Sequence, residues 1–262
     1  MSPEEPLANQ RPKTAAEITL VRKAGEIAAR VLRGASRLVV PGLTTAELDR
    51  QVGELIREQG AVSAFLGYRN FPAQCCLSVN EGVVHGIGND RRLQFGDLLK
   101  LDIGVRHRGF VGDVAMSMAV GGCSPVAQKL MDVTTEALHL GIRQARAGNR
   151  VIEISRAVQT HVESNGFSVV REFVGHGVGR TLHEEPQVPN FVDERNTARL
   201  KAGMTIAIEP MVNVGGPGVE ILGDRWTVVT RDRQLSAHFE HTVLVTDGDP
   251  EILTQDGMSP LY

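Results

Sequence analysis

Residues 98–120, LLKLDIGVRHRGFVGDVAMSMAV, contain two runs in which apolar residues recur at every second position. This alternation is typical of β-strands with one buried face, and the polar centre at His107 and Arg108 predicts a hairpin. A turn centred on these two residues would place Asp102 directly opposite Asp113. Opposed Cβ atoms lie about 4.5 to 5.5 Å apart. Two carboxylates at that spacing repel each other by about 3 kcal/mol at an effective dielectric near 20.

A folded protein tolerates such a pair in three ways. One carboxyl group is protonated, water screens both charges, or a cation lies between them. Another interpretation places Asp113 at the end of a strand in solvent. The pair alone leaves these alternatives open, so the decision depends on what the rest of the chain supplies.

The composition limits the class of protein. The 262 residues carry a net charge of -3, and 42% of them are hydrophobic, which is enough for one large core. This charge predicts no bulk attraction to nucleic acid or to an anionic membrane. The apolar runs are shorter than the roughly 18 residues of a membrane span, and the first residues lack a signal-peptide core, so we expect a cytoplasmic protein. The cysteines lack zinc-site spacing and are expected to be free thiols: Cys75, Cys76 and Cys123.

The order of predicted elements occurs twice along the chain. Residues 1–13, rich in proline and charge, are expected to form a flexible lead-in to a single domain over 14–262. The first half has helices from 15 to about 37 and from 45 to about 60, each opened by a capping box, and strands at 75–79, 98–106 and 110–120. The second half has helices at about 125–146 and 151–166, and strand-like runs at 167–174, 204–208, 226–230 and 238–246. We therefore expect an α+β fold of two similar halves around a shared sheet, with helices on its outer face.

Ionisable residues in apolar surroundings occur at three places in the second half. Glu209 ends the apolar strand MTIAI, and Glu240 lies within HFEHTVLV. Buried glutamates are rare unless they are paired or liganded. His176 lies between glycines in VGHGVG, and His183 follows it in the same segment. The histidines beside Glu240 are weaker candidates and are expected to be solvent-facing or structural: His238 and His241.

Four carboxylates and one imidazole form the candidate ligand set: Asp102, Asp113, His176, Glu209 and Glu240. One divalent ion does not need four negative ligands. Two ions about 3.5 to 4 Å apart, bridged by carboxylates and water, would balance the charge. Oxygen-rich ligands favour Mn, Fe(II) or Co over a zinc thiolate or copper site.

Five segments in register resemble type I methionine aminopeptidases of the bacterial type: NEGVVHGI, LDIGV followed by GFVGD, GHGVGRTLHEEP, MTIAIEPM and SAHFEHTV. The resemblance covers residues 14–254. It implies the pita-bread (creatinase/aminopeptidase) fold, with two pseudo-symmetric halves, a shared antiparallel sheet and a dinuclear metal centre. It also implies hydrolytic removal of the N-terminal methionine from nascent proteins and peptides, with a small second residue preferred.

The resemblance also implies residue roles. All five candidate ligands match family ligand positions, with Asp113 and Glu240 bridging two divalent ions. Glu209 would also be the general base. His85 would contact the substrate amide, and His183 would help to bind its carbonyl oxygen.

A methionine pocket is implied by a further set of residues: Phe65, Tyr68, Phe71, Cys76 and Trp226, with His85 and His183. Composition alone favours ordinary core positions, and the match to the family's pocket reverses that preference. Sulfur-aromatic contacts, worth about 0.3 to 1.5 kcal/mol each, suit a thioether side chain. The chain departs from the family's usual residues at positions that concern pocket shape and substrate range: Phe65, Arg69, Phe71, Gly88 and Leu182.

Two alternative functions share this fold. An aminopeptidase P or prolidase-like enzyme would cleave before proline, but such enzymes usually carry an added N-terminal domain, for which 13 residues are expected to leave no room. A non-catalytic binding protein would lack ligands, whereas every ligand position here is filled. The expected partners are peptides with N-terminal methionine and nascent chains, with transient ribosome association. The chain is expected to be a monomer that binds neither membranes nor specific nucleic acids.

Overall fold

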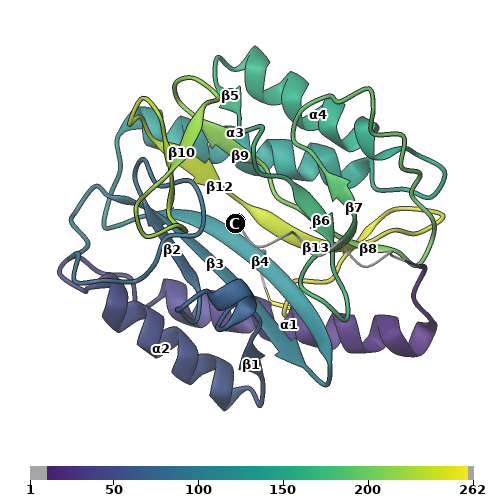
Figure 1. Cartoon of the computed structure of the whole chain (residues 1–262), viewed down its shortest axis with the longest axis horizontal. Helices are drawn as coiled ribbons and strands as arrows, with labels where there is room; N and C mark the ends of the chain where they lie inside the picture. Colours follow the sequence, from purple (N-terminus) through teal and green to yellow (C-terminus); the bar gives the residue numbers. More distant parts are fainter. Residues whose placement is uncertain (1–10, 259–262) are drawn as a thin grey trace.

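The structure is a computed structural model and describes residues 11–258 of the chain. The centre of this part is a nine-stranded antiparallel sheet. Its main path runs β1 (Val62–Ser63), β3 (Leu98–His107), β4 (Phe110–Ala119), β13 (Glu240–Leu244), β8 (Thr205–Ile208), β6 (Gly175–Gly177) and β7 (Glu184–Val188). At its sides, β2 (Cys76–Val79) pairs with β3, and β14 (Glu251–Ile252) pairs with β13. β13, near the end of the chain, therefore lies between strands of the two halves (Figure 1).

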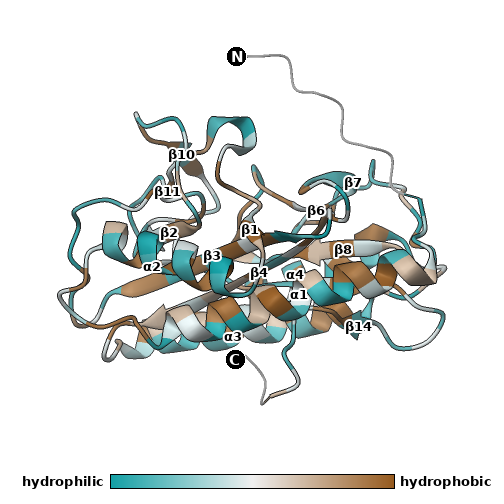
Figure 2. Cartoon of the chain, turned by 90° about the horizontal axis from the view of Figure 1, so that it is seen from below, coloured by the Kyte–Doolittle hydropathy of each residue, from teal (hydrophilic) through white to brown (hydrophobic). Residues whose placement is uncertain are grey.

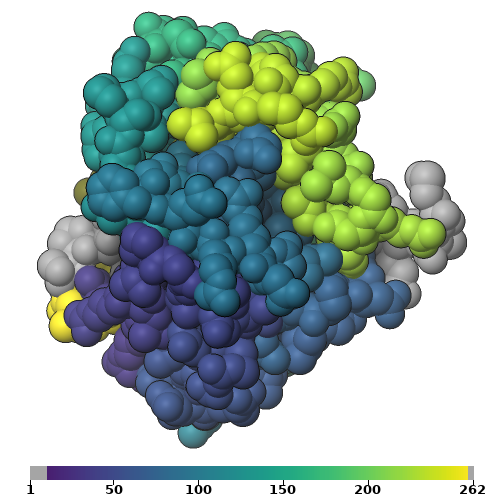
Figure 3. All heavy atoms as spheres, turned by 90° about the vertical axis from the view of Figure 1, so that its left-hand side faces the viewer, coloured from purple at the N-terminus to yellow at the C-terminus, as the bar shows by residue number. Residues whose placement is uncertain are grey.

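The helices of the described region lie on one face of this sheet (Figure 2). They are α1 (Ala15–Ser36), α2 (Thr45–Glu58), α3 (Pro125–Arg143) and α4 (Val151–Ser164). The other face carries loops, the short helix η1 (Tyr68–Asn70), and a hairpin of β10 (Val219–Ile221) and β11 (Val228–Thr230). A smaller sheet joins β12 (Ser236–His238), β9 (Met211–Asn213) and β5 (Ser168–Val169). Segments of both halves pack directly against each other on the face drawn in Figure 3.

The helix predictions are confirmed within a few residues. Thr14 and Thr44 form capping boxes with Glu17 and Glu47 at the starts of α1 and α2. The side chain of Ser124 caps α3. The predicted α+β architecture of two halves on one shared antiparallel sheet is therefore present.

The core lies between the helices and the sheet. Alternate apolar residues of β3 are buried in one cluster with residues of α1 and α2: Leu99, Leu101, Ile103 and Val105. Apolar residues of β8 and β13 are buried in a second cluster with α3 and α4: Ile206, Ile208 and Val243. Because side chains alternate along a strand, the intervening residues face the side of the sheet away from these helices.

The turn between β3 and β4 lies one residue later in the chain than expected. His107 pairs with Phe110, so the turn consists of Arg108 and Gly109. Both turn residues have positive φ, 48° and 81°. A two-residue turn of this kind matches the twist of the strands and favours glycine at its second position.

The expected register of this hairpin was wrong by two residues. Asp102 pairs with Ala115, and Asp113 pairs with Gly104, so the two aspartates are diagonal rather than directly opposed. Because side chains alternate with period two, this shift keeps both aspartates on one face. The interpretation of Asp113 as a solvent-exposed strand end is also wrong, since the residue is only 3% exposed.

Several strands differ from the expected runs. The run 167–174 contributes only β5, the run 226–230 contributes only β11, and the run 238–246 is broken at Phe239 between β12 and β13. Other strands were not predicted because they have only two or three residues or, in β7, a mostly polar sequence: β1, β6, β7, β9, β10 and β14. Residues 1–10 of the expected flexible lead-in lie outside the described residues.

Two further predictions from the sequence concern the cysteines and membrane-spanning helices. The cysteines are all free thiols, as predicted. Between residues 11 and 258, every helix is too short or too polar to pass through a bilayer.

Helix α1 lies unusually close to β4. A Cβ atom on Gly112 would lie 2.4 Å from the backbone nitrogen of Gly25 in α1. Gly25 in turn faces the carbonyl oxygen of Leu253, 2.4 Å from where its own Cβ would lie. The absence of both side chains therefore allows α1 to pack on the sheet backbone.

Gly112→Ala is expected to destabilise the fold by about 1 to 3 kcal/mol, because helix and strand backbones must move apart to admit the methyl group. Urea unfolding measures the difference. Gly223→Ala is the matched control, because a Cβ there would have no neighbour within 4 Å. Equal stability of the two variants would contradict this account of the packing.

Candidate metal centre and adjoining pocket

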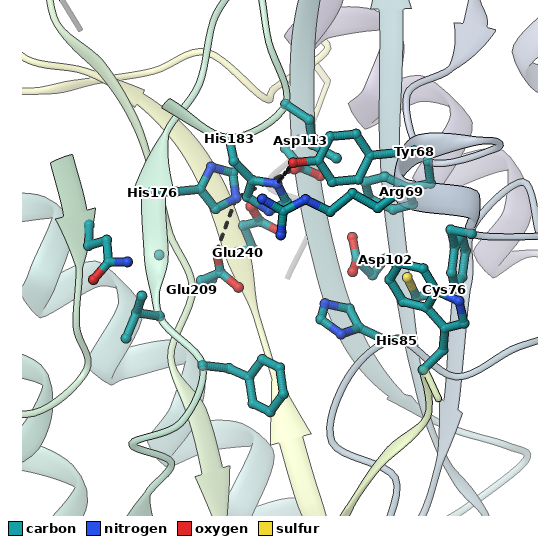
Figure 4. A pocket seen from close by; sticks show the side chains of 18 of the residues that line it. Tyr68, Arg69, Cys76, His85, Asp102, Asp113, His176, His183, Glu209 and Glu240 are labelled. Atoms are coloured by element: carbon teal, nitrogen blue, oxygen red, sulfur yellow. Dashed lines mark hydrogen bonds and ion pairs between the residues drawn. The ribbon is translucent and has the colours of Figure 1, made fainter. Parts of the chain in front are cut away.

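The candidate ligands form a row across the middle of the sheet, on the face away from the helices (Figure 4). Five neighbouring strands position one residue each: Asp102 on β3, Asp113 on β4, Glu240 at the start of β13, Glu209 directly after β8, and His176 on β6. The sequence separation between the outermost members is large, yet strand pairing brings them together. The structure thus collects all five predicted ligands on one surface.

Three of the five residues lie close enough together to hold a metal ion. Asp113, His176 and Glu240 offer ligand atoms that all lie within 4.8 Å of one another. His176 Nε2 is 3.4 Å from Glu209 Oε1 and 3.9 Å from Asp113 Oδ2. Among the described residues, the buried Oδ1 atoms of Asp102 and Asp113 have no hydrogen-bond partner. Buried carboxylate oxygens without partners fit a divalent cation, which prefers such ligands.

The carboxylates are held in an environment that disfavours their charge. Burial, followed by repulsion from neighbouring carboxylates, raises the pKa of Asp102, Glu209 and Glu240 well above the usual range. Burial likewise raises the pKa of Asp113 to about 7. A bound cation would reverse this preference, because opposite charge stabilises the ionised form.

His176 is suited to bind a metal in its neutral form. Burial lowers its pKa to about 4. Its Nδ1 lies 2.9 Å from the carbonyl oxygen of Gly177, so Nδ1 carries the proton and donates a hydrogen bond to that oxygen. Nε2, which faces the carboxylates, keeps its lone pair for a metal.

A cavity of about 520 Å³ adjoins the row. Every residue expected in the methionine pocket lines it: Phe65, Tyr68, Phe71, Cys76, His85, His183 and Trp226. Phe71 packs edge-on against both Phe65 and Trp226, at ring distances of 6.5 and 5.1 Å. Of the positions that depart from the family, Arg69 and Leu182 also line the cavity, whereas Gly88 lies against the α2 backbone.

The two histidines between the ligands and the aromatic wall are both neutral. Burial lowers the pKa of His85 to about 4 and that of His183 to about 2. His183 Nδ1 lies 2.7 Å from the Tyr68 hydroxyl group. His85 has a positive φ of 59°, an uncommon conformation for a residue with a side chain. Each of these neutral imidazoles can donate a hydrogen bond.

The histidines beside Glu240 are buried, so the solvent-facing alternative of the two expected for them is wrong. His241 is 5% exposed, and its Nδ1 contacts Thr254 Oγ1 at 2.7 Å. His238 is 1% exposed, and its Nε2 lies 3.6 Å from Glu209 Oε2. The available signal was the spacing of two between His238 and Glu240, which predicts a shared face on a continuous strand.

Comparisons with known proteins agree with this geometry. A family model described as metallopeptidase family M24 matches residues 19–247. Methionine aminopeptidase 1 of Bacillus subtilis (strain 168) is 46% identical over 243 residues, which cover 93% of this chain and 98% of that protein. Methionine aminopeptidase of Escherichia coli (strain K12) is 46% identical, with 92% of each chain covered.

Solved structures of a methionine aminopeptidase and of a prolidase also resemble this chain. The crystal structure of methionine aminopeptidase from Thermotoga maritima has a TM-score of 0.91 at 41% identity and covers 94% of this chain and 99% of that chain. Prolidase from Pyrococcus furiosus has a TM-score of 0.76 at 24% identity, and the match covers 93% of this chain and 65% of that chain. The second likeness shows the fold alone.

Without metal, the protein is expected to lose stability as the pH rises from about 4 to 7. The Asp113 pKa is about 7 in the folded chain, against about 3.9 when unfolded. The folded state binds more protons in this window, so raising the pH favours unfolding, by on the order of 4 kcal/mol for this group. Urea unfolding with chelator and with Mn²⁺ measures the difference. Parallel pH profiles with and without metal would contradict the prediction, and Asp113→Asn should make the metal-free profile less steep, because the other buried carboxyl groups still titrate.

Proposed function

Because the chain belongs to the methionine aminopeptidases of metallopeptidase family M24, which use divalent metal, we propose that its buried ligand row holds two metal ions. The chain has the pita-bread fold and acts as a metallo-exopeptidase that removes N-terminal methionine from peptides. The finer assignments below are proposals. The observation that carries them is the row of five ligand-type side chains from five adjacent strands.

The residues that would hold the metal ions are Asp102, Asp113, His176, Glu209 and Glu240. Four carboxylates match the charge of two divalent ions better than that of one. The oxygen-rich set supports Co, Mn or Fe(II). When bound, the metal ions polarise the scissile carbonyl group and lower the pKa of water.

Residues of the chain supply the proton transfers and hydrogen bonds of the proposed reaction. Glu209, beside His176 and 12% exposed at its side chain, accepts a proton from the attacking water. Neutral His183 donates to the substrate carbonyl oxygen as negative charge develops on it. His85 contacts the substrate amide near the scissile bond. The free α-amine of the substrate lies at the ligand row, which limits cleavage to the N-terminus.

The pocket is proposed to hold the methionine side chain between the rings of Phe65, Phe71 and Trp226, with Tyr68 and Cys76 completing its wall. An unbranched thioether fits such a surface. The 2.7 Å contact between His183 and the Tyr68 hydroxyl group supports a position of the scissile bond beside these two residues. The second residue then lies near the mouth, and a small side chain there avoids the rim.

We further propose a monomeric cytoplasmic enzyme with one catalytic domain over residues 14–262. Its substrates would include nascent chains, met during transient association with the ribosome. A prolidase-like activity has less support, because the prolidase likeness is at 24% identity.

Variants of the two pocket histidines and variants of the proposed carboxylate ligands should differ in metal content. His183→Ala and His85→Ala are expected to lower kcat roughly 10²- to 10³-fold with metal content unchanged, because each removes a donor to the transition state. Asp113→Asn and Glu240→Gln are expected to lower metal content itself, measured by elemental analysis. Loss of metal from the histidine variants would show that their roles are assigned wrongly.

Selectivity is tested with three peptides of matched length. Met-Ala-Ser should exceed Leu-Ala-Ser in kcat/KM by about 10- to 200-fold, because a branched side chain loses pocket contacts. Met-Leu-Ser should also be poor. Equal values for the first two peptides would refute the methionine pocket, and equal values for the first and third would refute the preference for a small second residue. Cleavage of Ala-Pro-Ala at a rate near that of Met-Ala-Ser would favour the prolidase-like alternative.

A further inference from the structure

A buried ion pair connects the residue before the α1 cap to the start of β7. Lys13 Nζ lies 3.3 Å from Glu184 Oε2, and the two side chains are only 6% and 10% exposed. The Lys13 backbone is fixed as well, because its N–H donates to the carbonyl oxygen of Gly203 at 2.8 Å. Its side chain covers Gly179, where a Cβ atom would lie 2.4 Å from Lys13 Cε. The ammonium group is therefore presented to Glu184 from a fixed position.

The other oxygen of Glu184 organises the turn that precedes it. Oε1 accepts the backbone N–H groups of Arg180 at 2.8 Å and Thr181 at 3.2 Å. Thr181 Oγ1 donates to the carbonyl oxygen of His183 at 3.1 Å. The Glu184 carboxylate is thus the centre of the turn 179–184, and His183 is its last residue before the strand.

The side chain of His183 extends from this turn into the pocket. Its ring lies 4.2 Å from the His176 ring, and its Nδ1 meets the Tyr68 hydroxyl group. Figure 4 shows His183 beside these two residues. A displacement of about 1 Å in a group that contacts a transition state can cost up to about 100-fold in rate.

We propose that Lys13 is a positioning residue for His183, acting through the buried ion pair with Glu184. The proposal rests on the proposed role of His183 toward the substrate carbonyl group. Removing one partner of a buried ion pair leaves the other charge uncompensated, which is strongly unfavourable. Without the ammonium group, the turn opens to hydrate the Glu184 carboxylate, and His183 moves with it.

A second ion pair near Lys13 provides the matched control. Arg11 contacts Glu17 at 2.7 Å, and Arg180 contacts the same carboxylate at 3.2 Å. The side chains of Arg11 and Arg180 are 64% and 66% exposed, whereas that of Glu17 is 11% exposed. Arg11→Met therefore removes a cation from the same segment but leaves the Glu17 carboxylate paired with Arg180 and hydrogen-bonded to Thr14.

A double-mutant cycle on the full chain tests the proposal with Met-Ala-Ser as substrate. Lys13→Met is expected to lower kcat roughly 10- to 100-fold with little change in KM, while Arg11→Met stays within about twofold of wild type. Lys13→Arg should recover most of the activity. In the His183→Ala background, Lys13→Met should change kcat by less than about twofold, because the positioned group is gone. Equal effects of Lys13→Met with and without His183 would overturn the proposal.

A second variant tests the proposal even if Lys13→Met has a folding defect. The double variant Lys13→Met/Glu184→Gln keeps an acceptor oxygen for the turn and removes the buried charge, so kcat should rise above that of Lys13→Met alone. Failure to rise in a folded, metal-loaded double variant would count against the proposal. If wild type does not cleave Met-Ala-Ser, the proposed function fails. The His183 imidazole resonances should still shift in Lys13→Met and not in Arg11→Met, and unshifted resonances would overturn the positioning role.

Discussion

The repulsion among carboxylates that are buried together on one face of the sheet is the constraint on which the rest of the structure depends. Asp102, Asp113 and Glu240 are each at most 8% exposed, and burial raises the pKa of all three. A sheet would gain stability from apolar residues at the same positions. Retaining acids there is understandable only if a cation compensates their charge, which is the chemistry that a metallopeptidase requires.

The architecture satisfies this constraint by giving each ligand its own strand. Helices cover the opposite face, so the strands are anchored by apolar side chains on one side and present polar ones on the other. The close approach of α1 to β4 at Gly112 fixes the strand that carries Asp113. The loops and the β10–β11 hairpin then enclose the polar face and form the pocket wall. Support and chemistry are thus separated by the two faces of a single sheet.

The sequence predicted the helices and the five ligand-type residues that the sheet brings together, but it did not predict the register or the short strands. Capping boxes at Thr14 and Thr44 are local signals, and isolated acids such as Glu209 in an apolar run are conspicuous. The predicted hairpin register was wrong because the register depends on the positive φ angles of the turn residues Arg108 and Gly109. Periodicity does not specify these angles. Strands such as β6, with three residues, are defined only by their neighbours in the sheet. The contact between Lys13 and Glu184 joins residues 171 positions apart, and nothing local marks it.

The central place of β13 has a consequence for how the molecule is made. This strand joins β4 to β8, yet residues 240–244 are among the last to be synthesised. Until they arrive, the sheet consists of two separate pieces with exposed edges, and the earlier ligands lie on different pieces. Formation of the sheet is therefore a late, long-range step that connects residues distant in sequence, a type of contact that slows folding. In an emerging copy of this chain, the five ligand-type residues can therefore form one row only after nearly all of the chain has left the ribosome, long after its own N-terminus has emerged.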